Sequence, residues 1–172
     1  ADCAGPGCGR RALSGADYCW DHLPNREAFM GSLAAAGLAG KWLMGVDLSG
    51  RDLTGANLEG SRLSGANLSG ATLSYATLSY TTLRGANLSG ANLRGVNLRG
   101  ADLRQADLSG AFMRGANLAQ TALNGANLQN AQLHSANLQD ADLREANLTG
   151  AVFTRATLPN SSQWEAQTDI SR

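Results

Sequence analysis

The sequence predicts a repeat protein whose chain turns once in every five residues around a narrow interior. From Val46 to Asn160 it divides into 23 consecutive five-residue units, with no insertion or deletion. The third position is Leu in 21 of these units, with Met113 and Phe153 as the exceptions, and the first position is Ala in 17. A fixed period of this kind decides the fold class before any local pattern is considered.

A period of five excludes one continuous helix or strand as the repeating element. On an α-helix, residues five apart point about 140° apart, so the leucines would wind around every side. In a continuous strand they would alternate between the two faces. The leucines share one interior only if the chain turns in each unit. Glycine often fills the fifth position, and it accepts the positive φ that a tight corner requires.

The first and third positions of a unit are two residues apart and therefore point the same way. We expect the Ala and Leu columns to point inward and the second, fourth and fifth positions to point outward. Alternating small and large side chains suit a narrow core. Leu103 is expected to lie fully inside, stacked between Leu83 and Leu123.

The A-(N/D)-L-x-G units resemble the pentapeptide repeat family, and the resemblance covers about two thirds of the chain. It implies an all-β solenoid, a right-handed quadrilateral β-helix with four units per coil. The 23 units would then make about six coils. At about 4.8 Å between stacked strands, the shaft would be roughly 28 Å long. Contacts between neighbouring coils stabilise such a solenoid, and its ends need caps.

Four parts are expected along the chain. Residues 1–24 form a zinc-knuckle-like module. Residues 25–45 form an N-terminal cap with a degenerate first coil, because Lys41 stands at an inward position of the unit before Val46. The β-helix itself covers residues 46–160, and residues 161–172 form a C-terminal cap or tail. Within the N-terminal cap, Asn25 is a candidate N-cap for a short helix over residues 25–37.

Several apolar residues of the N-terminal cap are expected to cover the open first coil, namely Phe29, Leu33, Trp42 and Met44. Arg51 stands at an inward position of that coil, where an unpaired buried guanidinium would be costly. Either the first coil is distorted, or Arg51 points out of its mouth.

The three cysteines all lie within the first 19 residues and, together with His22, predict a zinc site. Cys3, Cys8, Cys19 and His22 offer four soft ligands in two short pairs, the set that a structural Zn²⁺ site uses. The stretch resembles small zinc knuckles with three cysteines and one histidine. About 25 residues cannot build a stable core, so the metal would supply folding energy. The alternative is a disulfide with one spare thiol.

Composition and motifs argue against an enzyme. Basic and acidic residues balance, 14 against 14, which argues against general attraction to nucleic acid or anionic membranes. No apolar stretch reaches the length of a membrane span, and no signal peptide is evident, so a cytoplasmic protein is expected. His134 stands alone, glycine motifs follow the five-residue period, and a straight shaft offers no concave pocket.

In such a β-helix residues twenty apart stack, so the outward side chains can be mapped. One side carries Arg84, Arg104 and Arg144 beside Asp102 and Asp142, and these are expected to form surface ion pairs of little energetic weight. Another side departs from the polar pattern with the residues Tyr75, Arg94, Phe112, Arg114, His134 and Val152. Exposed aromatic residues with arginine are enriched in protein interfaces. Scattered apolar surface residues are also ordinary.

We therefore expect a non-enzymatic interaction module that presents this side to a protein partner. A β-helix also exposes unpaired strand edges at its ends. The C-terminal end has only Trp164 and a short polar tail to cover it. We expect a homodimer joined near residues 150–170, with Trp164 as a contact.

The family resemblance implies an alternative function. Some pentapeptide repeat proteins bind DNA gyrase or topoisomerase IV and protect them from quinolones or toxins as mimics of duplex DNA. That role depends on a strongly acidic surface and often on projecting loops. Residues 46–160 instead hold nine arginines against eight acidic residues, and no loop interrupts the units. A second alternative is nucleic-acid binding through the zinc module and the arginines of residues 84–114, which requires strongly salt-dependent affinity.

Overall fold

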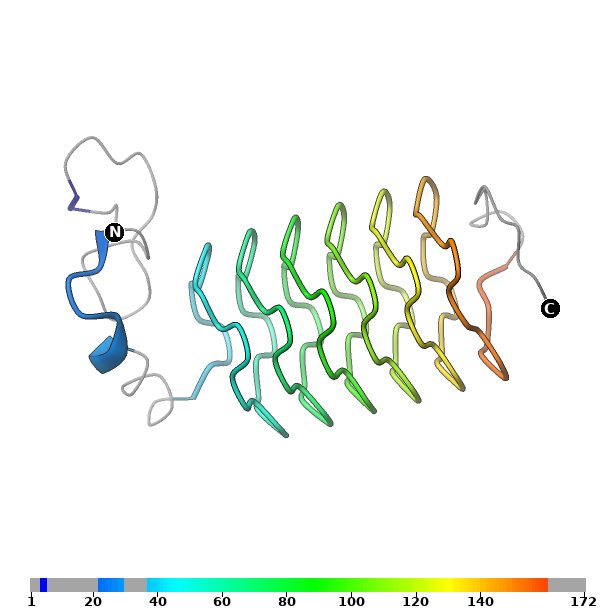
Figure 1. The fold of residues 1–172 in the computed structure, drawn as a ribbon, viewed down its shortest axis with the longest axis horizontal. Helices are drawn as coiled ribbons and strands as arrows, with labels where there is room; N and C mark the ends of the chain where they lie inside the picture. The colour runs from blue at the N-terminus through cyan, green and yellow to red at the C-terminus, as the bar shows by residue number, and fades with distance from the viewer. Residues whose placement is uncertain (1–3, 6–21, 30–36, 161–172) are drawn as a thin grey trace.

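The chain forms a shaft of stacked coils, and the short helix of residues 26–29 lies near its N-terminal end (Figure 1). This computed structural model describes residues 4–5, 22–29 and 37–160. A short helix covers residues 26–29, and the shaft is held by isolated parallel bridges without extended strands. None of the helices in the described ranges is long and apolar enough to cross a membrane.

Each coil contains twenty residues, because every second-position residue pairs with the one twenty residues further along. These bridges are all parallel and run from Trp42↔Arg62 to Asn137↔Thr157. A turn closes each unit except the last, residues 156–160, so each complete coil has four sides. The expected solenoid with four units per coil is confirmed, and the 120 residues from 41 to 160 make six coils of twenty.

Backbone hydrogen bonds explain why the second position is so often Asn or Asp. In residues 66–70, the first N–H closes the corner, the second donates to the previous coil, and the third and fifth donate to the next coil. The remaining N–H, that of Ser69, donates to Oδ1 of Asn67 at 3.2 Å. Ser109 donates to Asp107 in the same way at 2.9 Å. The second-position side chain thus satisfies the one backbone donor that coil stacking leaves over.

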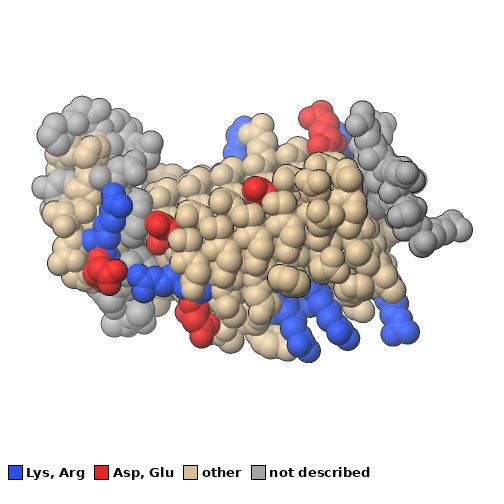
Figure 2. Space-filling view, in the orientation of Figure 1, with Lys and Arg blue, Asp and Glu red and all other residues tan. Residues whose placement is uncertain are grey.

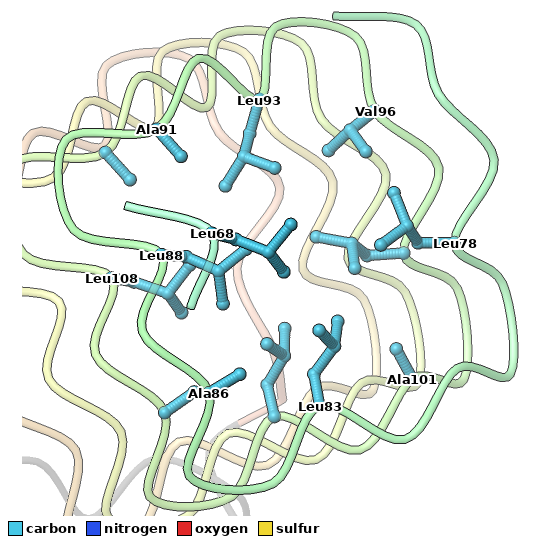
Figure 3. Packing of buried hydrophobic residues seen from close by; sticks show 14 of the residues in the cluster. Leu68, Leu78, Leu83, Ala86, Leu88, Ala91, Leu93, Val96, Ala101 and Leu108 are labelled. Carbon is cyan, nitrogen blue, oxygen red and sulfur yellow. The ribbon is translucent and has the colours of Figure 1, made fainter. Parts of the chain in front are cut away.

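The first and third positions fill the interior, as predicted. Leu83, Leu103 and Leu123 are all fully buried. Figure 3 shows Leu68, Leu88 and Leu108 stacked one behind another in successive coils. Burial of one leucine side chain contributes about 1.5–3 kcal/mol. Because the leucines of successive coils bury one another, each coil depends on its neighbours for stability.

The fifth position turns the corner with a positive φ. Glycine fills most corners, as at Gly70 with φ of 62°. Nine other residues adopt φ between 56° and 60°: Tyr75, Tyr80, Gln105, Gln120, Asn130, Ser135, Asp140, Glu145 and Arg155. Left-handed backbone costs a residue with a Cβ about 1–2 kcal/mol. Contacts between coils must therefore hold these corners against local strain.

The N-terminal end of the shaft departs from the sequence expectation in two ways. Coil geometry begins before residue 46, because the Gly40 N–H already donates to the carbonyl of Glu59 at 2.8 Å and Trp42 pairs with Arg62. Trp42 was expected to cover the open first coil, and the structure shows that it does not. It stands at an outward second position, and its ring lies over the Arg62 guanidinium, with 4.3 Å between Cζ and the ring centroid.

The N-cap prediction is confirmed, because Oδ1 of Asn25 accepts a hydrogen bond from the N–H of Ala28 at 3.0 Å. Phe29 is buried and joins the core cluster, as expected. Leu33 lies outside the described residues.

Arg51 leaves the interior while its coil stays regular. Its guanidinium is about half exposed and lies 3.9 Å from the carboxylate of Glu27. The neighbouring Asp52 still forms the normal bridge with Thr72. Of the two expectations for this residue, the outward-pointing one is therefore correct, since a charged side chain avoids burial by leaving through the mouth of the coil.

Candidate interaction side

One side of the shaft, which we call the mixed side, is built from the units that begin at residues 51, 71, 91, 111, 131 and 151. It holds all six residues proposed as a partner surface: Tyr75, Arg94, Phe112, Arg114, His134 and Val152. The bridges Phe112↔Gln132 and Gln132↔Val152 place the apolar pair in one column. The structure therefore brings these residues together on a single surface.

Two tyrosines project from neighbouring corners of one coil. Tyr75 is 63% exposed, and Tyr80 is 61% exposed. A Cβ built at Gly95 would lie 2.7 Å from Cδ1 of Tyr75, and one built at Gly100 would lie 2.8 Å from Cε1 of Tyr80. Each ring therefore rests against a glycine of the next coil. Tyr80 shows the same sequence signal as Tyr75, an aromatic residue at a corner that usually holds glycine, but it belongs to the next side of the shaft.

Phe112 occupies a second position, where the repeat normally places the acceptor for a backbone N–H. In the unit before it on this side, Asn92 accepts the N–H of Arg94 at 3.3 Å. Phe112 has no acceptor, and within the described part of the chain no protein group accepts the N–H of Arg114. The Phe112 side chain is 55% exposed, so its burial does not offset the lost hydrogen bond.

Arginines on a different side of the shaft are neutralised within their own units. Arg104 and Arg144 each contact the aspartate two residues earlier, with 2.6 Å between Nη2 and Oδ2 in both pairs. The hydrogen bond from Arg144 holds the pKa of Asp142 well below its ordinary value, and Arg104 lowers the pKa of Asp102 in the same way. The expected surface ion pairs are thus present.

The mixed side lacks such pairing. Arg94 and Arg114 take the same fourth position as Arg104, but no salt bridge involves either of them among the residues that the structure describes. His134 follows in the next coil, and its Nε2 lies 3.2 Å from Oε1 of Gln132. Figure 2 shows basic side chains projecting along one edge of the shaft, while most of the visible surface is uncharged.

The predicted zinc ligands Cys3, Cys8 and Cys19 lie outside the described residues, as does Trp164. The fourth ligand, His22, packs against Gly5. A Cβ built at Gly5 would lie 2.7 Å from Nδ1 of His22, so only glycine fits there. No group of three metal-binding side chains gathers within residues 4–5, 22–29 and 37–160.

The repeat matches the family described as pentapeptide repeats, in eight copies, over residues 43–79, 73–110, 101–140, 111–150 and 136–162. The chain belongs to the pentapeptide repeat family. No curated protein matches this pentapeptide repeat protein.

Several solved structures are similar to it. Rfr23, a pentapeptide repeat protein from the cyanobacterium Cyanothece 51142, shares 25% identity over 68% of this chain and 90% of its own, with a TM-score of 0.32. HetL, from the cyanobacterium Nostoc sp. strain PCC 7120, shares 24% identity over 83% of this chain and 100% of its own, with a TM-score of 0.29. QnrB1, a plasmid-mediated fluoroquinolone resistance protein, shares 18% identity over 73% of this chain and 86% of its own, with a TM-score of 0.32. Superpositions this loose carry no argument about function.

Proposed function

We propose that this protein is a non-enzymatic interaction module, a rigid right-handed β-helix that presents the mixed side to a protein partner. Phe112 is the observation that supports the proposal. It costs the shaft the hydrogen bond to the Arg114 N–H, and its ring stays 55% exposed. Exposed aromatic residues that the fold does not need are typical of interface anchors.

Capture of partners from a host lysate with the intact protein tests this proposal. Phe112→Asn restores the usual residue of the repeat, so it should fold at least as well as the wild type and lose the captured protein. Ala122→Asn makes the same kind of change at the second position of a different side, serves as the control and should retain it. A captured protein that binds Phe112→Asn as well as the wild type would contradict the proposal.

Cys3, Cys8, Cys19 and His22 are further proposed to bind one structural zinc ion. The packing of Gly5 on His22 supports this, because Gly5 lies between Cys3 and Cys8 in sequence. Zinc would tie this loop to His22 and stabilise the fold of the module. Elemental analysis should find one zinc per chain, and Gly5→Val should lower that content. A zinc-free folded protein, or one with a Cys3–Cys8 disulfide, would overturn the assignment.

The C-terminal end is proposed to join two copies in a homodimer near residues 150–170. The interior loses cover toward this end, since Leu148 is 5% and Leu158 is 43% exposed whereas Leu103 is fully buried. Trp164→Ala should weaken the dimer without affecting partner capture. A wild-type protein that sediments as a monomer at high concentration would exclude the dimer.

Gyrase binding is the competing function. Mimicry of DNA needs an acidic surface, and the charged residues central to the mixed side are Arg94 and Arg114. We therefore expect no gyrase inhibition in a supercoiling assay at modest concentrations of the protein. Potent inhibition would make gyrase the better candidate partner.

A further inference from the structure

We propose that the partner of the mixed side contributes an acidic, extended polypeptide segment that lies along the shaft over Arg94 and Arg114. The inference rests on the proposed interaction function and names the chemistry of the partner. Arg94, Arg114 and His134 occupy the fourth position in three successive coils. Stacked strands are about 4.8 Å apart, so the side chains of Arg94 and Arg114 start from neighbouring coils. We call these two residues the arginine ladder.

No acidic residue of the mixed side neutralises this ladder. Its units from residue 71 to residue 155 contain neither Asp nor Glu. Like charges at such spacing repel one another, so the ladder costs the isolated shaft free energy. Carboxylates supplied from outside would remove that cost.

The repeat has a simple internal solution that the mixed side does not use. An aspartate at the second position neutralises an arginine at the fourth, as the Asp142–Arg144 contact of 2.6 Å shows. The corresponding residues before Arg94 and Arg114 are Asn92 and Phe112. A partner carboxylate would take the place of the missing aspartate, and the planar guanidinium binds carboxylates through two parallel hydrogen bonds.

Aromatic residues flank the ladder and indicate apolar residues in the bound segment. The backbone N–H of Tyr75 donates to the carbonyl of Arg94 at 2.9 Å, and its ring rests on Gly95. Phe112 stands two residues before Arg114. Same-side residues of an extended peptide are about 6.6 Å apart, a spacing that long arginine side chains can reach from adjacent coils. A segment with acidic and aromatic residues fits both features.

The charge of the whole protein favours a polypeptide over a nucleic acid. Affinity for nucleic acid comes from many phosphate contacts, whereas this chain has zero net charge and the ladder offers two arginines. A few carboxylates suffice to match such a ladder. The experiment therefore includes single-stranded DNA as a competing ligand and distinguishes its binding from that of the acidic peptide.

The experiment uses the full-length protein and a fluorescein-labelled synthetic peptide of repeated Glu-Phe-Asp. A Gln-Phe-Asn peptide and single-stranded oligo-dT serve as comparisons. We expect the acidic peptide to bind more tightly than either comparison, with an affinity that falls as salt rises. The double change Arg94→Gln, Arg114→Gln should weaken binding at least about tenfold, as the loss of two charge-assisted contacts implies.

Two matched controls locate the binding. Arg84→Gln removes one charge from the same position of the repeat on another side and should leave binding unchanged, whereas Arg114→Gln should weaken it. Tyr80→Gly and Tyr75→Gly form the second pair, since both tyrosines have the same corner conformation and similar exposure. Only Tyr75→Gly should reduce affinity.

The outcomes separate this inference from the proposed function. If Arg84→Gln and Arg114→Gln weaken the acidic peptide equally, general charge attraction explains binding and the inference is wrong. Tighter binding of oligo-dT would replace it with nucleic-acid recognition. If the acidic peptide does not bind, but Phe112→Asn abolishes capture of a natural partner, the interaction function stands and the acidic partner does not.

Discussion

The inward and outward positions of the repeat follow opposite rules, although they alternate within the same five residues. In the unit 101–105, Leu103 is fully buried between identical neighbours, whereas Arg104 points to solvent and pairs with Asp102. In the unit 111–115, the inward residues are again apolar, but Phe112 has replaced the aspartate. The interior therefore sets the fold, and the exterior can differ from side to side without changing it.

The largest effect should come from moving a charge across this boundary. Leu103→Ala should cost about 2–5 kcal/mol of stability, because a buried leucine leaves a cavity. Leu103→Arg should prevent folding, since the interior has no partner for a charge. Arg104→Leu, one residue away and outward, should fold normally. Chemical denaturation would measure all three, and a Leu103→Arg protein with unchanged melting would contradict the inward assignment.

A smaller effect should separate two polar residues inside the shaft. The hydroxyl of Thr81 donates to the carbonyl of Leu58 at 2.9 Å. The hydroxyl of Ser61 is equally buried and has no hydrogen-bond partner among the described residues. Thr81→Val should cost about 1 kcal/mol for the lost hydrogen bond, whereas Ser61→Ala should be neutral or stabilising, because it removes an unsatisfied group. Urea midpoints that fall equally for both variants would show that the hydrogen bond is unimportant.

The corners should respond in the direction opposite to the core. Tyr75→Gly and Tyr80→Gly should each raise stability by roughly 0.5–1 kcal/mol, because glycine adopts positive φ without the clash of a Cβ. The ring of each tyrosine contributes little, since more than half of the side chain is exposed. Thermal melts of the two variants should rise together. A clear loss of stability in either would mean that its contact with the neighbouring glycine outweighs the strain.

The smallest effect should concern the outer ion pair of Asp142 with Arg144. The folded pKa of Asp142 lies below its ordinary value of 3.8, so the carboxylate contributes stability above about pH 4. That contribution is lost as the pH falls through the folded pKa. Asp142→Asn keeps an acceptor for the Arg144 N–H but removes the charge. It should cost a few tenths of a kcal/mol at pH 7.

Denaturation curves of the wild type and of Asp142→Asn, recorded between pH 7 and pH 2, would measure this difference. The difference should shrink steadily as the pH falls below about 4. A gap of the same size at pH 7 and at pH 2 would point to packing instead of charge.

Much of the fold could be predicted, because the leucine period requires one turn in every unit and the resemblance to pentapeptide repeats implies four units per coil. The start of the first coil could not, since Lys41 at an inward position suggested a break before Val46. A lysine stem can lie along apolar surface while its ammonium reaches water, and Lys41 is only partly exposed. The prediction that Trp42 covers the open coil was wrong because it treated the unit of Lys41 as irregular. That unit is regular, and Trp42 at its second position faces outward.

The residues that form the candidate site could be predicted, but which of its arginines lack an ion-pair partner could not. Residues twenty apart share a side, so Arg94, Phe112 and Arg114 could be grouped from their numbers alone. Which arginines are neutralised depends on individual side-chain distances. Arg84 was grouped with the ion pairs of its side, yet the residue that contacts Asp102 at 2.6 Å is Arg104.

The closure of each coil after twenty residues also restricts how this protein can change length. An insertion of five residues between Phe112 and His134 keeps every leucine inside but turns all later units by a quarter revolution, so it would move His134 and Val152 away from Phe112. An insertion of twenty lengthens the shaft and preserves the alignment of its sides. The core thus tolerates length changes in steps of five, whereas a surface shared by several coils tolerates them only in steps of twenty.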